Sequence, residues 1–321
     1  MKDLTIVILT YNEEANIERC LDSVAPVKAP IFVVDSFSTD RTLSILSERA
    51  IPYVQHEFKN YAAQRNWSQA NLPKNTTWVL QLDAGERLTP AMAKWLNEEF
   101  DPNDDSVTGY MFARRAIFMG RWMKYGGYHP IYHLRLYRRE LGHCEHKVYD
   151  QHFVVEGPTK VAAKGADLED GVMSSLKDFT ISHARWAVFE AVESILAEKE
   201  TGEVKARFFG NPIERKRWLK ARVFQRTPLF LRSFLYLFHR YFLKLGFLDG
   251  KEGLVFHFLQ GFWFRFLVDS TILEIKKELE HSPLEEVIKS KYDLDINKFL
   301  NREPETNNDT PQVALPEPQS V

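Results

Sequence analysis

Short apolar runs alternate with amphipathic stretches through the first hundred residues. Runs rich in Val, Ile and Leu predict strands near 4–10, 31–35, 51–55 and 78–83, and helical spacing predicts helices near 13–25, 39–49, 60–71 and 89–99. Strands that alternate with helices favour a parallel sheet with right-handed crossovers. The pattern therefore predicts an α/β fold, with helices on a central sheet.

The pattern of predicted elements changes after the first hundred residues. Further strands are predicted at 107–118 and 131–138, with a turn at Gly126-Gly127, and residues 140–180 look irregular. The spacing becomes helical from 187 to about 280, and the polar, Pro-rich end predicts disorder. We expect an α/β domain over 1–185, a helical extension over 186–300 and a disordered tail over 301–321.

Three of the predicted strands run directly into polar loops. The first is followed by Thr10-Tyr11-Asn12-Glu13, the second by Asp35-Ser36, and the third by Asp83-Ala84-Gly85-Glu86. The carboxyl ends of parallel strands meet at one edge of a sheet, where ligands bind. Carboxylates at that edge suit a nucleoside and a divalent cation that neutralises phosphate.

Composition narrows the class of protein. The 321 residues are 44% hydrophobic and 27% charged, with a net charge of -2, as in an ordinary globular protein. Cys20 and Cys144 form no disulfide framework, which fits a reducing cytosol. Strand-like sequence begins almost at once, so we expect no signal peptide. We also expect no spanning helix, because no run of about 18 uncharged apolar residues occurs.

Five stretches in order resemble the family 2 glycosyltransferases, which have a GT-A fold. They are Ile6–Glu14, Val33–Asp40, Asn60–Asn66, Leu82–Arg87, and Gly126–Pro130 running on to Leu134–Arg139. Together they are similar to the branch of lipopolysaccharide-core β-1,4-glucosyltransferases and exopolysaccharide transferases. The resemblance spans roughly residues 3–280 and implies a nucleotide-sugar-binding sheet.

The resemblance implies roles for the loop residues. Asp35, with Ser36 and the Thr10–Glu13 loop, would bind the uracil nucleoside of the donor; alone, Asp35 also fits a helix-capping role. The family's metal motif is Asp-X-Asp, and Asp83 holds its first place. Gly85 stands at the second, so Glu86 is the candidate substitute ligand for Mg²⁺ or Mn²⁺. A capped turn is the structural alternative for this loop.

Arginines and further carboxylates complete the candidate site. Arg65 and Arg135 can pair with phosphate oxygens, although Arg65 also fits a solvated helix face. Single displacement needs a carboxylate to take the acceptor proton. Asp150 is our candidate general base, because Val148-Tyr149-Asp150 occupies the place of the branch's Val-His-Glu, and Glu145 is second. The spacing of His143, His146 and His152 matches no standard zinc pattern.

Basic and aromatic residues are concentrated in 205–245. Eleven Lys and Arg face one acidic residue, Glu214, and ten aromatic residues lie among them. Basic amphipathic helices with aromatics suit an anionic membrane surface. The alternative is a helical subdomain packed on the sheet. We expect no nucleic-acid binding, because the aromatics recur at helical spacing and not as a stacking module.

The sequence thus predicts transfer of a hexose from a nucleotide sugar, UDP-linked by expectation, to a hydroxyl of a lipid-linked saccharide or polysaccharide precursor. The resemblance implies inversion, and the protein would work at the inner face of the cytoplasmic membrane. Two other classes remain open. One is a non-catalytic partner in a polysaccharide assembly complex. The other is a nucleotidyltransferase, which normally carries a Gly-rich N-terminal loop unlike Thr10–Glu13.

Overall fold

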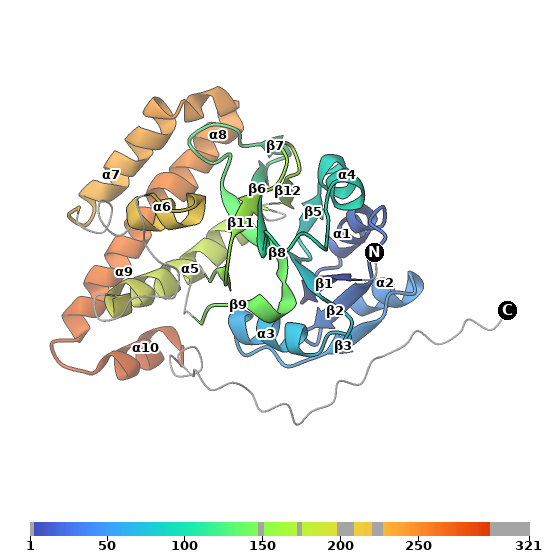
Figure 1. Cartoon of the computed structure of the whole chain (residues 1–321). Helices are drawn as coiled ribbons and strands as arrows, with labels where there is room; N and C mark the ends of the chain where they lie inside the picture. Colours follow the sequence, from blue (N-terminus) through green and yellow to red (C-terminus); the bar gives the residue numbers. More distant parts are fainter. Residues whose placement is uncertain (1–2, 147–150, 172–174, 198–208, 220–226, 296–321) are drawn as a thin grey trace.

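A mixed sheet with flanking helices forms one side of the molecule, and a group of helices forms the other (Figure 1). The computed structural model describes residues 3–146, 151–171, 175–197, 209–219 and 227–295. The predicted fold class, an α/β sheet flanked by helices with a C-terminal helical extension, is confirmed. The predicted tail over 301–321 lies outside the described residues.

The first hundred residues follow the predicted alternation. They form β1 (Leu4–Thr10), α1 (Ile17–Val24), β2 (Ile31–Asp35), α2 (Thr42–Glu48), β3 (Tyr53–Gln55), α3 (Tyr61–Ala70), β4 (Trp78–Asp83), β5 (Glu86–Leu88) and α4 (Pro90–Glu98). Thr89 caps α4, its hydroxyl accepting the Met92 N–H, and Pro90 occupies the first turn as expected.

The middle of the chain contains more strands than the sequence indicates. It forms β6 (Gly109–Phe118), β7 (Arg121–Trp122), β8 (Tyr132–Arg138), the 3₁₀ turn η1 (Arg139–Leu141), β9 (Gly142–Cys144), β10 (Phe153–Val155), β11 (Thr159–Val161) and β12 (Leu168–Gly171). The prediction that 140–180 is irregular was therefore wrong. The four strands of that segment, β9 to β12, are three or four residues long, too short to show a period of two.

The strand order explains where the site lies. The large sheet runs β3-β2-β1-β4-β8-β6-β12-β5. The first four strands are parallel, as predicted, whereas β8 is antiparallel to both β4 and β6. Thr10 lies opposite Asp35, and Leu9 lies opposite Asp83. The carboxyl ends of β1, β2 and β4 therefore meet at one edge.

β1 is buried along its whole length because it is covered on both faces. Ile6 and Ile8 pack in one apolar cluster with Leu80, whereas Val7 and Val79 pack on the other face with neighbouring strands and α3. Successive side chains of a strand point to opposite faces. An unbroken apolar run is thus what a central strand of this sheet requires.

Helices form the C-terminal part of the described chain. It comprises α5 (Leu176–Ala197), α6 (Pro212–Leu219), α7 (Leu231–Phe238), the π-helical η3 (His239–Leu243), the 3₁₀ turn η4 (Gly246–Asp249), α8 (Gly250–Phe256), the π-helical η5 (His257–Trp263), α9 (Phe264–Glu278) and α10 (Leu284–Tyr292). The predicted boundary between 185 and 186 falls inside α5, so the domain limits stay predictions. No described helix is long and apolar enough to cross a membrane.

A buried ion pair joins α7 to α9. The guanidinium of Arg232 donates from Nε to Asp269 Oδ1 at 2.7 Å, and its Nη2 donates to the same oxygen. The other oxygen, Oδ2, accepts the Phe230 N–H at 2.7 Å. Both side chains are less than a tenth exposed. Arg232 is one of the eleven basic residues of 205–245 that suggested a membrane surface, but it is buried and joins α7 to α9.

We expect Asp269→Ala to destabilise the extension by roughly 3–5 kcal/mol, because it leaves the Arg232 charge buried without a partner. Urea unfolding followed by tryptophan fluorescence measures this. Lys291→Ala is the matched control: it removes exposed ion pairs to Glu274 and Glu278 and should leave the midpoint almost unchanged. Equal midpoints for both variants would show that the buried pair is not a stabilising contact.

Candidate functional site

The edge formed by β1, β2 and β4 brings together the three predicted loops. Thr10 Oγ1 donates to Asp35 Oδ1 at 2.9 Å, which ties the end of β1 to the end of β2. Asp83 ends the neighbouring strand, and its side chain is 38% exposed. Asp83 is therefore the predicted carboxylate that a ligand at this edge can reach.

The loops after β1 and β2 are fastened to each other. The Asn12 N–H donates to Ser38 Oγ at 2.9 Å, and the Thr39 N–H donates to Asn12 Oδ1 at 2.8 Å. Asn12 adopts a positive φ of 53°, which asparagine tolerates better than most residues. The Glu13 N–H donates to Thr42 Oγ1 at 2.8 Å. This network fixes the backbone of both loops.

Two aromatic side chains project from these fastened loops. Tyr11 is 59% exposed and Phe37 is 53% exposed, and Phe37 has a positive φ of 60°. Tyr11 belongs to the predicted donor loop, whereas Phe37 was not among the predicted site residues. Its signal in the sequence was an aromatic residue standing between two serines of a polar loop.

Asp35 is fully buried, and its carboxylate accepts hydrogen bonds from the loop that follows it. Its carboxylate accepts from Thr10, from the Ser38 N–H at 2.8 Å and hydroxyl at 2.5 Å, and from Gln55 Nε2 at 3.1 Å. Direct contact between Asp35 and a uracil stays a prediction. Ser36 Oγ accepts from Gln64 Nε2 at 3.1 Å and is thereby held by α3.

Three consecutive residues of α3 hold three parts of the site. Gln64 contacts Ser36, as described. Arg65 Nη2 donates to both oxygens of Asp83, at 2.9 and 3.1 Å. Asn66 exchanges two hydrogen bonds with the backbone of Cys144, at 2.8 and 3.0 Å. The helix begins at Asn60, whose side chain accepts the Ala63 N–H, so its register is fixed by a cap.

Asp83 and Glu86 form a compact ion network with two arginines. Arg135 reaches across from β8, and its Nη2 donates to Asp83 Oδ2 at 3.2 Å and to Glu86 Oε1 at 2.5 Å. The Asp83 N–H donates to Glu86 Oε2 at 3.1 Å. Both predicted phosphate-binding arginines therefore contact the carboxylates at this edge.

Charge and burial act in opposite directions on these carboxyl groups. Burial acts to raise the pKa of Asp83, but the charges of Arg65 and Arg135 outweigh it and hold the pKa well below its ordinary value. Burial raises the pKa of Glu86, with Arg135 opposing the shift. Burial also raises the pKa of Glu13. Asp83 thus remains ionised across the physiological range.

In this arrangement, the carboxylates of Asp83 and Glu86 do not fit a divalent cation. Both oxygens of Asp83 accept from guanidinium groups, and both oxygens of Glu86 accept from Arg135 and a backbone N–H. Within the described parts of the chain, no group of three or more His, Cys, Asp or Glu side chains is placed to hold a metal. Metal binding by Asp83 and Glu86 stays a prediction.

Of the two candidate general bases, the structure describes Glu145 and not Asp150. Asp150 lies outside the described residues. Glu145 is completely buried, and its Oε1 contacts the His152 N–H at 3.2 Å and the ring Nδ1 at 3.1 Å. This position suits a role in joining β9 to the segment before β10. Contact between Glu145 and an acceptor would require this segment to move.

A carboxylate that the sequence did not single out lies beside the network. Asp170 on β12 is the register partner of Glu86 on β5 and forms an ion pair with Arg114 at 3.1 Å. Its side chain is 26% exposed. Asp170 stands in a four-residue strand within the segment predicted to be irregular, so no local pattern pointed to it.

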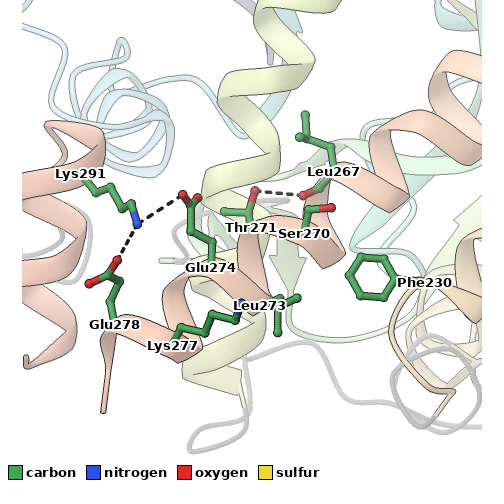
Figure 2. A pocket seen from close by; sticks show the side chains of 9 residues that line it. All are labelled: Phe230, Leu267, Ser270, Thr271, Leu273, Glu274, Lys277, Glu278 and Lys291. Carbon is green, nitrogen blue, oxygen red and sulfur yellow. Dashed lines mark hydrogen bonds and ion pairs between the residues drawn. The ribbon is translucent and has the colours of Figure 1, made fainter. Parts of the chain in front are cut away.

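A hollow elsewhere on the molecule is not part of this edge. It has a volume of about 450 Å³ and lies on α9, lined by side chains that include Phe230, Thr271 and Lys291 (Figure 2). Lys291 pairs there with Glu274 and Glu278. Its lining contains none of the predicted site residues.

Comparison with known proteins finds a family match for the part of the chain that carries this edge. Residues 5–153 match the family described as Glycosyl transferase family 2. An uncharacterized glycosyltransferase of Rickettsia typhi is 28% identical over 121 residues, and one of Rickettsia bellii is 32% identical over 110 residues. These matches cover 37% and 34% of this chain, and 41% and 37% of those relatives.

Solved structures are similar to this chain at lower sequence identity. The mannosyltransferase PcManGT of Pyrobaculum calidifontis, in complex with GDP-Man and Mn²⁺, is 15% identical, with a TM-score of 0.47 over 84% of this chain and 87% of that one. S. aureus TarS 1-349, in complex with UDP-GlcNAc, is also 15% identical, with a TM-score of 0.39 over 87% and 92%. At these scores the likenesses carry no argument about donor or metal. The similarity of the chain to glycosyl transferase family 2 is thus a similarity of its residues 5–153.

Proposed function

We propose that the protein transfers a hexose from a nucleotide sugar to a hydroxyl group of a lipid-linked saccharide. The observation that carries the proposal is the convergence of Thr10, Asp35 and Asp83 at one sheet edge of a family 2 domain. The fastened loops 11–14 and 36–42 offer a rigid platform for a nucleoside, with Tyr11 and Phe37 exposed for stacking. UDP is the donor nucleotide that the family resemblance implies.

The reaction we propose is a single displacement. The acceptor oxygen attacks the anomeric carbon, the bond from that carbon to the phosphate oxygen breaks, and the nucleoside diphosphate leaves with the electron pair. A carboxylate takes the proton of the acceptor hydroxyl. Attack opposite the leaving group inverts the anomeric configuration. Asp83 would hold the donor through its ribose or through a cation, and the arginines behind it would balance its charge.

Asp83→Ala is expected to abolish transfer and to remove most of the affinity for UDP, because Asp83 is the exposed carboxylate of the ion network. Isothermal titration with UDP and a sugar-release assay over a panel of UDP-sugars measure both effects. Asp105→Ala is the control, since this carboxylate is 93% exposed and pairs only at the surface, with Arg138. Wild-type turnover in Asp83→Ala would refute the role given to this residue.

The general base can be identified by comparing three variants. Asp150→Asn is expected to lower turnover by about 10²–10⁴-fold with UDP affinity nearly unchanged, because a base contacts the acceptor and not the nucleotide. Glu145→Gln and Asp170→Asn are the competitors. If only one of the competitors lowers turnover in this way, that residue takes the role instead. Full activity in all three variants would show that the general base is another residue.

Assays of sugar release and of nucleotide-sugar synthesis separate the glycosyltransferase from the two alternative classes. A non-catalytic partner would bind UDP or a UDP-sugar without releasing sugar, whereas a nucleotidyltransferase would form the nucleotide sugar from a nucleoside triphosphate and a sugar phosphate. Measurable transfer or hydrolysis of a UDP-sugar, with no such synthesis, supports the glycosyltransferase.

A lipid-linked acceptor is supported by an apolar face on the extension. Between 231 and 258 it exposes Leu231, Phe234, Leu235, Phe238, Phe242, Leu243, Leu245, Phe247, Leu248, Leu254 and Phe258, each at least 44% exposed. Ring contacts link Phe234, Phe262 and Phe258 into one surface. Exposed lysines near it include Lys244 and Lys251. Large exposed apolar patches mark interaction sites, and lysines suit anionic headgroups.

We expect the chain to bind anionic vesicles, and the binding to weaken with salt, because exposed charges are screened over roughly 8–10 Å at physiological ionic strength. The double variant Phe238→Ser/Phe242→Ser should lower the fraction bound at least about tenfold by removing apolar area that lipid would bury. Ile181→Ser on α5, also exposed, is the matched control. Sedimentation with phosphatidylglycerol vesicles measures both, and equal soluble recovery at all salt concentrations would contradict the proposal.

A further inference from the structure

The charge at the donor edge is already balanced by the protein itself. Two carboxylates, Asp83 and Glu86, contact two guanidinium groups, Arg65 and Arg135. Each of the four carboxylate oxygens accepts at least one N–H within 3.2 Å. A divalent cation that used these oxygens would have to approach two fixed positive charges.

The two arginines are held firmly in this arrangement. Arg65 and Arg135 are each less than a tenth exposed, and both guanidinium groups lie over the Phe153 ring, at 5.2 and 5.8 Å. Removing either from its carboxylate would leave a buried charge without its partner, which is strongly unfavourable. The arginines are therefore not readily displaced by an incoming cation.

Gly85 shows that the missing carboxylate is not excluded by packing. A Cβ built at Gly85 meets no atom within 4 Å, and its φ is not in the left-handed region. The fold thus has space for a side chain where the family motif has its second aspartate. The sequence leaves that space empty and places the Arg135 guanidinium on Glu86 instead.

Arg135 also retains a donor that no carboxylate uses. Its Nη2 serves both Asp83 and Glu86, whereas its buried Nε has no hydrogen-bond partner in the described structure. A guanidinium group carries five N–H donors and binds phosphate as well as carboxylate.

We propose that Arg65 and Arg135 replace the divalent cation, so that this protein binds the diphosphate of its donor without Mg²⁺ or Mn²⁺. The inference rests on the proposed function, since it concerns the same donor edge. It opposes what the family motif implies. In place of a cation held by two aspartates, it assigns to the two arginines the N–H donors that would contact the phosphate oxygens.

The first test is isothermal titration of the full chain with UDP, in EDTA and then in Mg²⁺ or Mn²⁺. We expect dissociation constants that agree within about threefold. Binding that is at least about tenfold tighter with either cation would overturn the inference and leave the proposed function intact. Absence of UDP binding in every buffer would instead refute the proposed donor, and the inference with it.

The second test uses position 85 and needs no nucleotide. Binding of Mn²⁺ alone, followed by the loss of its free-ion paramagnetic resonance signal, is expected to be absent in the wild type and to appear in Gly85→Asp. Gly85→Asn is the matched control for volume. Wild-type binding of Mn²⁺ as tight as that of Gly85→Asp would overturn the inference.

The third test addresses the arginines. Arg135→Gln combined with Glu86→Gln removes one charge of each sign, so it avoids a buried unpaired charge, and circular dichroism confirms its fold. We expect at least about tenfold weaker UDP binding in EDTA, because a phosphate-binding donor is lost. Wild-type affinity of this folded variant in EDTA would show that Arg135 does not replace the cation.

Discussion

Four buried or half-buried charges determine how the donor edge is assembled. Asp83 on β4, Glu86 on β5, Arg65 on α3 and Arg135 on β8 form one network, and both arginines are less than a tenth exposed. A single buried charge without a partner costs several kcal/mol. The helix and the three strands must therefore reach their native positions together, because each supplies a charge that another neutralises.

This constraint extends outward through α3. Arg65 is fixed by Asp83, so the residues on either side of it are fixed too, and they hold the Ser36 loop and strand β9. His56 stacks on Trp67 of the same helix at 3.9 Å and contacts Gln64. The position of Asp83 at the end of β4 thus determines, through α3, the position of the loop that follows β2.

The sequence was sufficient for those parts of the site that depend on local pattern. Apolar runs identified β1, β2 and β4, and parallel strands must deliver Thr10, Asp35 and Asp83 to one edge. It could not show that Asp35 would be surrounded by protein donors, because Ser38 and Gln55 reach it through backbone turns and pairing that no periodicity encodes. It also could not show which charge Arg135 meets, since that depends on the antiparallel pairing of β8 with β4.

The amino-acid composition of 205–245 suggested a surface role for basic residues that in fact make contacts inside the protein. Arg240 lies in the basic segment, yet it is buried, donates to the Gly126 carbonyl at 3.0 Å and stacks over Tyr128 at 4.7 Å. A count of basic residues cannot separate a guanidinium that faces lipid from one that joins two parts of the fold. The apolar face at 231–258 was visible only once the buried side of each helix was known.

The same contacts couple the apolar face to the sheet. Asp249 accepts the N–H groups of Lys124 and Tyr125 at 3.1 and 3.0 Å, and Gly126 adopts a positive φ where a Cβ would collide with the His257 ring. The loop between β7 and β8 is therefore shaped by the extension, and Arg240 fastens it from the other side. Because β8 carries Arg135 into the ion network, the segment that would lie on lipid and the edge that would hold the donor are linked through one strand.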